Sequence, residues 1–237
     1  MLTLKILFWA MLLIVFYTYI GYGILLYIII RLKRFFRGKP REAVLPPDEE
    51  LPDMTLLICA YNEEDVVAEK MKNTLAIDYP KDKFRIMWVT DGSNDHTNEL
   101  LKAYPEVDIV FSPERRGKSA ALKHGLRELK TRYVAFTDAN TMLNPCAMKE
   151  IARQFMDPTV GCVSGEKRVL AKKDGDMAAE GEGLYWRYES TLKRWDSELY
   201  STMGAAGELY AIDPTLVREV PDEALLDDFM MSMYVVE

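Results

Sequence analysis

The stretch that decides the fold is Tyr133-Val134-Ala135-Phe136-Thr137-Asp138-Ala139-Asn140. It begins with a short apolar run, which is typical of a buried strand, and polar residues follow at once. Because side chains alternate along a strand, Asp138 and Asn140 face the same side and present two oxygen donors to one point in space. The alternative is that they only cap the next helix, but Asn144-Pro145 offers that helix a better start. The stretch therefore predicts a divalent-metal and phosphate site at a strand end.

Strand-like and helix-like segments alternate on both sides of this stretch. Further strands are expected at Met54–Ala60, Phe84–Thr90, Val107–Ser112 and Val160–Val163. Helices are expected near Glu64–Ile77, Lys118–Leu129 and Pro145–Met156. This alternation predicts an α/β fold with a mostly parallel sheet covered by helices.

Polar residues collect where three of these strands end. The three segments are Tyr61-Asn62-Glu63, Asp91-Gly92-Ser93 and Asp138-Ala139-Asn140. In parallel sheets, ligands bind beyond the carboxyl ends of the strands. We therefore expect the three segments to line one crevice.

The N-terminal region contains 25 consecutive residues without a charge, from Ile6 to Ile30. At about 1.5 Å per residue, a helix of this length exceeds the roughly 30 Å hydrocarbon core of a bilayer. A secretory signal would need a shorter apolar region and a small-residue cleavage site, and a buried soluble helix would be less uniformly apolar. We predict a tip at residues 1–5 and a transmembrane helix at residues 6–30.

A linker is expected at residues 31–53, basic at first and then rich in proline and acidic residues. Between Pro40 and Asp53 there are four prolines and five acids, a composition typical of a linker. The globular body is expected at residues 54–237. Beyond Leu170, Ala171–Gly183 is expected to be a mobile loop and Leu184–Tyr200 a helix.

Charge is distributed unevenly about the apolar segment. Lys5 precedes it, and six cations follow, namely Arg31, Lys33, Arg34, Arg37, Lys39 and Arg41. The positive-inside rule therefore predicts a single-pass protein of the cell membrane with its body in the cytoplasm. The remaining residues carry 23 cations and 37 anions, which argues against nucleic acid as a partner. The basic segment itself suits the anionic headgroups of membrane lipids.

Cysteine and histidine offer little chemistry. Cys59, Cys146 and Cys162 form no Cys-x-x-Cys pair, so they are expected to be buried fillers in a reducing compartment. His96 and His124 are the only histidines, which is too few for a histidine-based metal site or triad.

The expected helix at Leu184–Tyr200 carries an apolar stripe. Its members recur at steps of three and four and are Tyr185, Tyr188, Leu192, Trp195 and Leu199. Core packing is the favoured interpretation. A sugar platform and a position in the membrane interface remain open, since Trp and Tyr are favoured there.

Cations at Arg115-Arg116-Gly117-Lys118 precede the good helix former Ser119-Ala120-Ala121-Leu122. The helix macrodipole prefers anions at this end. A bound phosphate, held by the free amides of the first turn and by Lys118, would compensate. A solvated surface cluster is the alternative.

Three acidic groups are further candidates. Asp91-Gly92 is a common turn dipeptide, but at a strand end its carboxylate can accept a hydrogen bond from a nucleobase or ribose. Asn62-Glu63-Glu64-Asp65 opens a helix, where the dipole alone explains the acids. Asp227-Asp228 lies among apolar residues, which favours a raised pKa for at least one carboxylate and suits a general base. The alternative is that both acids only start a helix.

Together these residues resemble the family 2 inverting glycosyltransferases, particularly the membrane-embedded branch of cellulose, hyaluronan and poly-N-acetylglucosamine synthases. Cys59-Ala60-Tyr61-Asn62-Glu63 is similar to the first strand and nucleotide contact of that family, and Thr90-Asp91-Gly92-Ser93 to its uracil-contacting Asp-Gly. Arg116-Gly117-Lys118 resembles the segment near the donor phosphates. Asp138-Ala139-Asn140 resembles the metal motif, in which Asn140 replaces an acid and lowers the negative charge available to the metal.

The resemblance also covers the later part of the chain. Leu226-Asp227-Asp228 is similar to the Thr-Glu-Asp motif, which makes Asp228 the expected base, with Asp227 as second candidate. Gly204-Ala205-Ala206-Gly207 is similar to the turn beside the acceptor. The chain ends nine residues after Asp228, before the Gln-x-x-Arg-Trp motif and later membrane helices of processive synthases. A fragment, a split gene product and an inactive remnant are therefore all open.

The resemblance implies a GT-A-like domain and inverting transfer from a UDP-sugar donor to a carbohydrate or lipid-linked acceptor. It implies Mg²⁺ or Mn²⁺ as cofactor, and it leaves room for a membrane subunit encoded downstream. One alternative is a non-catalytic, membrane-anchored subunit that binds the nucleotide sugar. Another is a nucleotidyltransferase, which would carry a glycine-rich basic loop where this chain has Ala60-Tyr61-Asn62-Glu63.

Overall fold

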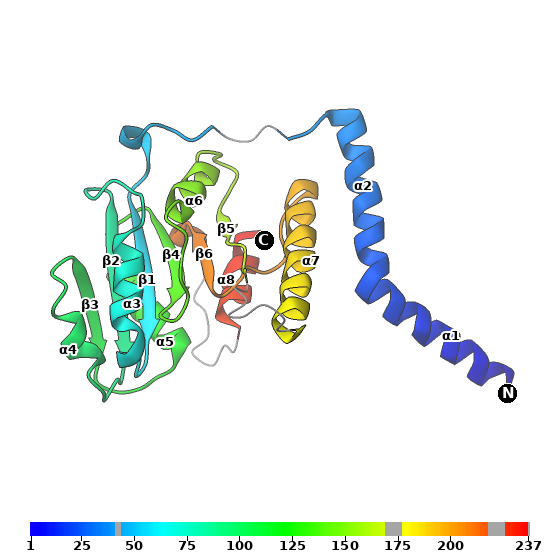
Figure 1. The fold of residues 1–237 in the computed structure, drawn as a ribbon. Coiled ribbons are helices and arrows are strands. Elements are labelled where there is room, and N and C mark those ends of the chain that lie inside the picture. The colour runs from blue at the N-terminus through cyan, green and yellow to red at the C-terminus, as the bar shows by residue number, and fades with distance from the viewer. Residues whose placement is uncertain (41–43, 169–176, 218–225, 237) are drawn as a thin grey trace. The chain divides into compact units, whose positions relative to one another are not determined.

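A computed structural model describes residues 1–40, 44–168, 177–217 and 226–236 of this chain (Figure 1). Its contacts divide the chain into two compact units. One contains Met1–Glu42 with Arg168–Met203, and the other contains Ala43–Lys167 with Gly204–Glu237. The two units are described separately. The segment at residues 169–176, which holds the first part of the expected mobile loop, lies outside the described residues.

The second unit is built on a six-stranded sheet with the order β3-β2-β1-β4-β6-β5. Its strands are β1 (Met54–Ala60), β2 (Phe84–Asp91), β3 (Val107–Ser112), β4 (Tyr133–Asp138), β5 (Cys162–Ser164) and β6 (Leu209–Ile212). The first four strands are parallel, and β6 runs antiparallel to β4 and β5. The expected α/β fold with a mostly parallel sheet is confirmed.

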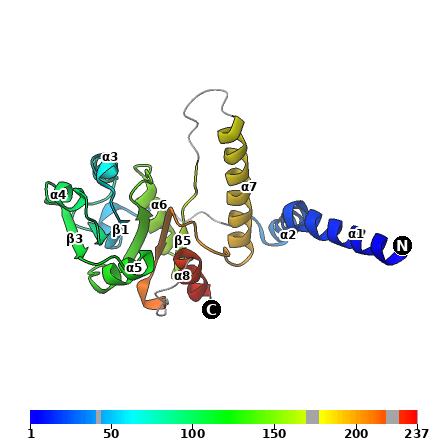
Figure 2. The ribbon, with the colours of Figure 1, turned by 90° about the horizontal axis from the view of Figure 1, so that it is seen from below.

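Helices cover both faces of this sheet. They are α3 (Glu64–Leu75), α4 (Thr97–Leu101), α5 (Lys118–Arg127), α6 (Ala147–Phe155) and α8 (Asp227–Val236). Figure 2 shows α3 and α5 on opposite faces. Alternation along β1 explains the two layers, because Leu56 and Ile58 belong to one buried cluster and Leu57 to the other.

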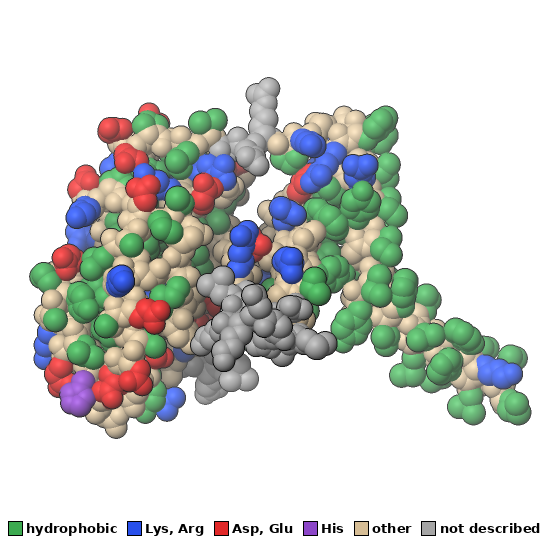
Figure 3. Space-filling view, in the orientation of Figure 1, with side chains coloured by type: hydrophobic (Ala, Val, Ile, Leu, Met, Phe, Trp, Pro, Cys, Tyr) green, Lys and Arg blue, Asp and Glu red, His purple; other side chains and the backbone are tan. Residues whose placement is uncertain are grey.

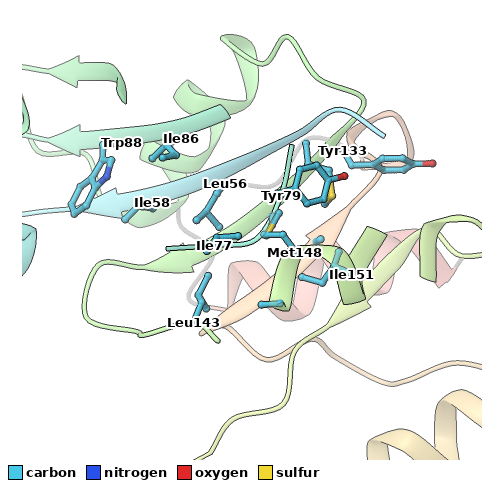
Figure 4. Packing of buried hydrophobic residues seen from close by; sticks show 14 of the residues in the cluster. Leu56, Ile58, Ile77, Tyr79, Ile86, Trp88, Tyr133, Leu143, Met148 and Ile151 are labelled. Atoms are coloured by element: carbon cyan, nitrogen blue, oxygen red, sulfur yellow. The ribbon is translucent and has the colours of Figure 1, made fainter. Parts of the chain in front are cut away.

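The larger cluster lies between the sheet and helices α3 and α6 (Figure 4). Ile58 and Trp88 come from neighbouring parallel strands, and Met148 and Ile151 come from one face of α6. All four side chains are buried. On the other face, α5 approaches so closely that a Cβ on Gly125 would lie 2.5 Å from Leu57 Cδ1.

Several expected element boundaries need correction. Asn144-Pro145 does not start α6, which begins at Ala147 with Cys146 at the N-cap. The short strand β6 and the short helix α4 were not expected from the pattern. The end of the expected linker belongs to the sheet unit, since Leu51 is buried and Tyr79 Oη donates to Pro52 O at 2.6 Å.

The sheet has its topological switch point at the carboxyl ends of β1 and β4, and the space beyond these strand ends is called the crevice below. The chain adds β2 and then β3 on one side of β1, and it then returns to place β4 on the other side. Such a reversal is where open α/β sheets bind ligands. Asp138 at the end of β4 is in register with Cys59 of β1, so the loops that follow both strands open into the same place.

The first unit contains the N-terminal helices. They are α1 (Leu2–Phe16), the π-helical segment η1 (Tyr17–Gly21) and α2 (Tyr22–Arg37). The helix bends where η1 interrupts it (Figure 1), as expected for a π-helical insertion. Hydrophobic side chains dominate its surface (Figure 3). Leu2–Arg37 is the one described helix long and apolar enough to cross a membrane, by length and composition alone, and it fits a membrane anchor.

The same unit contains α7 (Met177–Leu199). It starts earlier than expected, so part of the supposed loop after Ala171 is helical. Its apolar stripe packs against η1 and α2, since Tyr188 Oη donates to Tyr19 O in η1 at 2.8 Å and the rings of Trp195 and Tyr27 in α2 lie 5.5 Å apart. Tyr185 stays 58% exposed. The stripe thus packs in part against the N-terminal helix.

Two cations of the basic segment bind α7. Arg34 forms a double hydrogen bond with the Glu198 carboxylate, at 2.8 and 2.6 Å. Lys33 Nζ donates to the backbone oxygens of Glu198 and Leu199 at the end of α7. Cations are favoured at a helix C-terminus because the macrodipole is negative there. These two side chains therefore have protein partners in addition to any lipid headgroup.

Candidate active site

Side-chain amides fasten the loop after β1 to the loop after β2. Asn62 is the one described residue other than glycine with a positive φ, 53°, which Asn tolerates. Its side chain donates to Asn94 Oδ1 at 2.8 Å and accepts from the Asn94 N–H at 2.9 Å. Its own N–H donates to Ser93 Oγ at 3.1 Å. The two loops therefore form one connected rim of the crevice.

The first turn of α3 is capped from the same neighbouring loop. The Glu63 N–H donates to Thr97 Oγ1 at 2.9 Å, and the Glu64 N–H donates to Asp95 Oδ2 at 3.1 Å. Burial raises the pKa of the Glu63 carboxyl, and the charge of Asp138 raises it further. Glu63 therefore lies within electrostatic range of Asp138 at the end of β4.

An arginine covers the aromatic ring at the end of β1. The Arg115 guanidinium lies 3.9 Å from the centroid of the Tyr61 ring, within the range of a cation–π interaction. Gly92 makes this possible, because its φ is 69° and a Cβ there would lie 2.5 Å from the Arg115 nitrogen. Only glycine allows the backbone after β2 to pass so close to the segment that precedes α5.

Asp91 supplies the anion at the start of α5. It is 5% exposed, and its carboxylate accepts from the Arg116 N–H at 3.0 and 2.9 Å and from the Gly117 N–H at 2.7 Å. The dipole of α5 is therefore complemented within the chain, and it does not by itself require a bound phosphate. The same bonds engage both oxygens of the carboxylate that we expected to contact a nucleobase or ribose.

Lys118 reaches across to β4. Its ammonium donates to Asp138 Oδ1 at 2.8 Å, with the two side chains 45% and 36% exposed. The Lys118 pKa is raised overall: burial alone would lower it, but the Asp138 partner and the more distant Asp227 raise it. A direct ion pair thus joins the start of α5 to Asp138, the first residue of the expected metal motif.

The Asp138–Asn140 segment offers a limited set of metal ligands. Asp138 is the last residue of β4 and is partly exposed. The buried Ala139 and the exposed Asn140 belong to the turn that follows, so strand alternation does not extend to Asn140. Among the described residues, no three His, Cys, Asp or Glu side chains group closely enough to hold a metal ion. Hard oxygen donors suit Mg²⁺ or Mn²⁺. One carboxylate and one amide fit a cation that takes most of its other ligands from a bound diphosphate or from water.

Asp227 and Asp228 open α8 at the other side of the crevice. Asp227 is buried, and its Oδ2 has no hydrogen-bond partner. Burial raises the Asp227 pKa most, the Lys118 charge lowers it, and the Asp228 and Asp138 charges raise it. Asp227 is therefore close enough to Lys118 and Asp138 for their charges to change its pKa.

The turn at residues 204–207 lies against the start of α8. A Cβ on Gly207 would lie 2.8 Å from Asp228 Oδ2, and one on Gly204 would lie 2.7 Å from the Phe229 ring. The Ala205 N–H donates to Ser232 Oγ at 3.0 Å, which fastens the turn to α8. The expected acceptor-side turn and the expected base are therefore in contact.

The structure brings most of the predicted site residues to one edge of the sheet. Ala60 is buried at the end of β1, directly before the exposed Tyr61. The cysteines differ from expectation, since Cys146 is exposed and Cys59 and Cys162 are partly buried. Burial raises the pKa of the Cys59 thiol to about 12, which fits an inert filler.

Two groups that shape the site were missed from the sequence. Arg115 was treated only as one of several cations, and nothing in the pattern indicated its contact with Tyr61. Lys70 was read as part of an ordinary helix, although it is buried beneath the Asp138–Asn140 segment. Asn62 carried a weak signal, because Asn directly after a strand is compatible with a positive φ.

Comparison with known families gives a match over most of the sheet unit. The family described as Glycosyl transferase family 2 matches residues 55–212. Poly-beta-1,6-N-acetyl-D-glucosamine synthase of Staphylococcus aureus is 35% identical over 128 residues, which are 52% of this chain and 31% of that protein. The synthase of the same name from Staphylococcus epidermidis is 28% identical over 145 residues, 58% of this chain and 35% of that protein. The match thus spans about a third of these curated relatives.

Solved structures with the same architecture include a mannosyltransferase, PcManGT, from Pyrobaculum calidifontis in complex with GDP-Man and Mn²⁺. It aligns with 95% of this chain and 63% of its own, with 26% identity and a TM-score of 0.73. Staphylococcus aureus TarS, residues 1–349, aligns with 78% of this chain and 55% of its own, with 16% identity and a TM-score of 0.57. The second likeness shows the fold alone.

Proposed function

Because this chain belongs to glycosyl transferase family 2, we propose that it transfers a sugar from a UDP-sugar donor to a polysaccharide or lipid-linked acceptor. One observation carries this proposal. Asp138, Lys118 and the Asp227–Asp228 pair act on one another at the carboxyl ends of β1 and β4. A cation and several carboxylates in one crevice suit the handling of a diphosphate and a proton.

The nucleotide part of the donor is assigned to the rim formed by the first two strand ends. Tyr61 offers an aromatic face, and Arg115 already covers it with a planar cation, so a nucleobase would take the place of the guanidinium or stack with it. Glu63 and Asp91 lie beside this position. A nucleotide-sugar donor is supported by PcManGT, which was solved with GDP-Man and Mn²⁺. The choice of uracil over guanine rests on the resemblance of Thr90-Asp91-Gly92-Ser93 to a uracil contact.

The diphosphate is assigned to Lys118 and to the Asp138–Asn140 segment. A divalent cation, when bound, would neutralise diphosphate charge as the sugar departs, and Asp138 and Asn140 are the oxygen donors that would hold it. Lys118 is the nearby ammonium, and it is now paired with Asp138. If Asp138 held the divalent cation, the Lys118 ammonium would lose its present partner and could contact the leaving phosphate oxygens.

The chemical step is assigned to Asp228. Its carboxylate takes the proton of an acceptor hydroxyl while the hydroxyl oxygen forms a bond to the anomeric carbon of the donor sugar. The bond from that carbon to the phosphate oxygen breaks on the opposite side, so the configuration inverts and the nucleoside diphosphate leaves. Asp228 suits this role because it is partly exposed and adjoins Gly207, whereas Asp227 is buried behind it.

The N-terminal helix is proposed to anchor the enzyme in the cell membrane, with the sheet unit in the cytoplasm. Six cations after the apolar segment against one before it support this orientation. Nucleotide sugars made in the cytosol would then reach the crevice directly. Membrane lipids are the expected neighbours of α1 and α2, and a second membrane subunit remains compatible with this arrangement.

Two substitutions separate an enzyme from a binding subunit. Asp228→Asn keeps the size of the side chain but cannot accept a proton, so we expect at least a hundredfold loss of transfer with UDP affinity within a few-fold of wild type, as for loss of a general base. Asp138→Ala should lose both transfer and metal-dependent UDP binding. Asp108→Asn, an exposed acid on β3, is the matched control and should change neither.

The assay is transfer from a panel of UDP-sugars, with GDP-mannose included, by full-length protein in detergent. UDP binding is measured by calorimetry with Mn²⁺ and with EDTA. Wild-type protein that binds UDP but transfers no sugar to any acceptor would favour the binding-subunit interpretation. Full turnover by Asp228→Asn would move the base to Asp227.

A further inference from the structure

Lys70 is a buried cation directly beneath the Asp138–Asn140 segment. It lies on α3 and is 0% exposed, and it is the one buried lysine or arginine in the described part of the chain. Burying an ammonium is costly unless hydrogen bonds or opposite charges compensate. A methionine or leucine would fill this place in the core without that cost. The position of the charge therefore requires a local explanation.

The partners of Lys70 bracket the metal motif. Its Nζ donates to Thr141 O at 2.5 Å, directly after Asn140, and to Thr137 Oγ1 at 3.4 Å, directly before Asp138. The Thr137 hydroxyl is oriented for this contact, because it donates its own hydrogen to Glu208 O at 2.8 Å. One ammonium thus connects both ends of the segment that carries the two oxygen donors.

A second side chain of α3 holds the same loop three residues further on. Asn73 Nδ2 donates to Leu143 O at 2.8 Å, and the Leu143 N–H donates to Asn73 Oδ1 at 2.8 Å. These two hydrogen bonds satisfy both the backbone N–H and the backbone oxygen of Leu143, as a neighbouring strand would. Lys70 and Asn73 lie on one face of the helix, since residues three apart are neighbours there.

We propose that Lys70, assisted by Asn73, is a positioning residue that holds the Asp138–Asn140 loop so that both oxygen donors face the bound diphosphate. The assignment of the ligand rests on the proposed function, whereas the clamp itself is a property of the fold. Asp138 ends β4 and Asn140 lies in the turn that follows, and both side chains are at least partly exposed, so core packing fixes neither of them. Lys70 acts through the backbone around them and touches no ligand.

Hydrogen exchange tests the clamp without metal or donor. In full-length protein in detergent, Lys70→Met should exchange the amides of residues 138–143 at least tenfold faster, while the amides of β1 and β2 keep their wild-type rates. Lys72→Met is the matched control, because Lys72 is an exposed lysine on the same helix. Wild-type exchange at residues 138–143 in Lys70→Met would overturn the proposal.

Metal binding tests the consequence of the clamp. Substitutions beside metal ligands commonly cost 10- to 100-fold in affinity, so Lys70→Met should weaken Mn²⁺ binding in the presence of UDP by at least about tenfold. Saturating Mn²⁺ should restore most of kcat, which general misfolding would not allow. Asn73→Ala should weaken Mn²⁺ binding in the same direction and serves if Lys70→Met fails to fold. Unchanged or tighter Mn²⁺ binding in the folded variant would overturn the proposal, because loss of the buried charge alone favours a cation.

The two experiments separate this proposal from the proposed function. If wild-type protein binds neither Mn²⁺ nor UDP, the proposed function fails, and the exchange rates still decide whether Lys70 holds the loop. If wild type binds both and Lys70→Met behaves as wild type in both experiments, the positioning role fails alone.

Discussion

At the residue scale, single charged side chains of this protein form hydrogen bonds to the backbone of the site loops. Asp91 accepts three hydrogen bonds from the two amides before α5, and Lys70 donates to the loop after β4. Both groups are buried, so each loop is held by an interaction that water does not weaken. At the residue scale, the site is arranged by buried charges that need not touch a substrate.

We expect Asp91→Asn to loosen the start of α5. The amide that replaces the carboxylate is neutral and turns a donor toward the Arg116 N–H, so the hydrogen bonds from the two backbone amides weaken, at a cost of about 1–3 kcal/mol. Thermal unfolding of the full chain and the KM for the donor would both report the change. Asp108→Asn, an exposed position on β3, is the control. An unchanged melting temperature and KM in Asp91→Asn would show that the α5 start does not depend on this carboxylate.

Lys70 should also make stability depend on pH. Burial lowers the Lys70 pKa from the ordinary 10.5 to about 8, although the Asp138 charge opposes the shift. Between these values the unfolded chain binds more protons than the folded chain, so the free energy of unfolding rises with pH. From pH 7 to 9.5 we expect wild type to gain on the order of 2 kcal/mol relative to Lys70→Met. Chemical unfolding of both proteins at each pH measures this gain, and parallel pH responses would contradict it.

At the scale of elements, close approach between helices and their neighbours depends on glycine. Gly125 lets α5 lie on β1 and β2, since a Cβ there would meet Leu57 at 2.5 Å and Val89 at 2.8 Å. In the other unit, Gly23 lets α7 approach α2, since a Cβ would meet Tyr188 Oη at 2.7 Å. Helix α5 carries Lys118, so its distance from the sheet affects the crevice directly.

Gly125→Ala should therefore destabilise the sheet unit although alanine favours helices. The added methyl group must displace Leu57 or Val89, and overpacking of this kind costs about 1–3 kcal/mol. Gly181→Ala in α7 is the matched control, because a Cβ there meets nothing within 4 Å and the change should stabilise by about 0.5–1 kcal/mol. Unfolding midpoints of the two variants should move in opposite directions. Equal shifts would indicate that α5 adapts without cost.

At the scale of the whole molecule, the N-terminal helices and the sheet unit differ strongly in charge and hydrophobicity. The surface of α1 and α2 is largely apolar, whereas the sheet unit carries mixed charges (Figure 3). The residues beyond the basic segment hold 37 acids and 23 basic residues, so they are repelled by anionic headgroups. The basic segment has the opposite preference. These charges support the proposal of a membrane anchor with an acidic cytoplasmic body.

Labelling from outside whole cells tests this orientation. In a Cys146→Ser background, which removes the exposed cysteine, Val44→Cys should resist an impermeant thiol reagent until the cells are permeabilised. Val44 is 86% exposed, so burial would not explain the resistance. Thr3→Cys, on the other side of the apolar segment, should label without permeabilisation. Labelling of Val44→Cys in intact cells would reverse the proposed topology.

The sequence by itself determined the features that arise from short-range patterns. Strands β1 and β3 lie at the residues expected from their apolar runs, and the ends of β1, β2 and β4 meet at one edge because parallel strands bring their carboxyl ends together. The helix at Leu2–Arg37 contains the predicted apolar segment for the same reason, since length and composition are local properties. Asp138, Lys118 and the Asp227–Asp228 pair were selected on such grounds, and the family resemblance then chose Asp228 from the pair.

Only the tertiary structure decided how these residues are used. The four-residue strand β6 is too short to show a pattern, and its pairing with β4 joins residues more than 70 positions apart in the chain. The anion at the start of α5 comes from Asp91, and the cation beneath Asp138 comes from α3. Each of these pairs joins residues that are distant in the chain, and no local propensity encodes such a contact. The fold therefore follows largely from local pattern, whereas the electrostatics of the site follow from long-range packing.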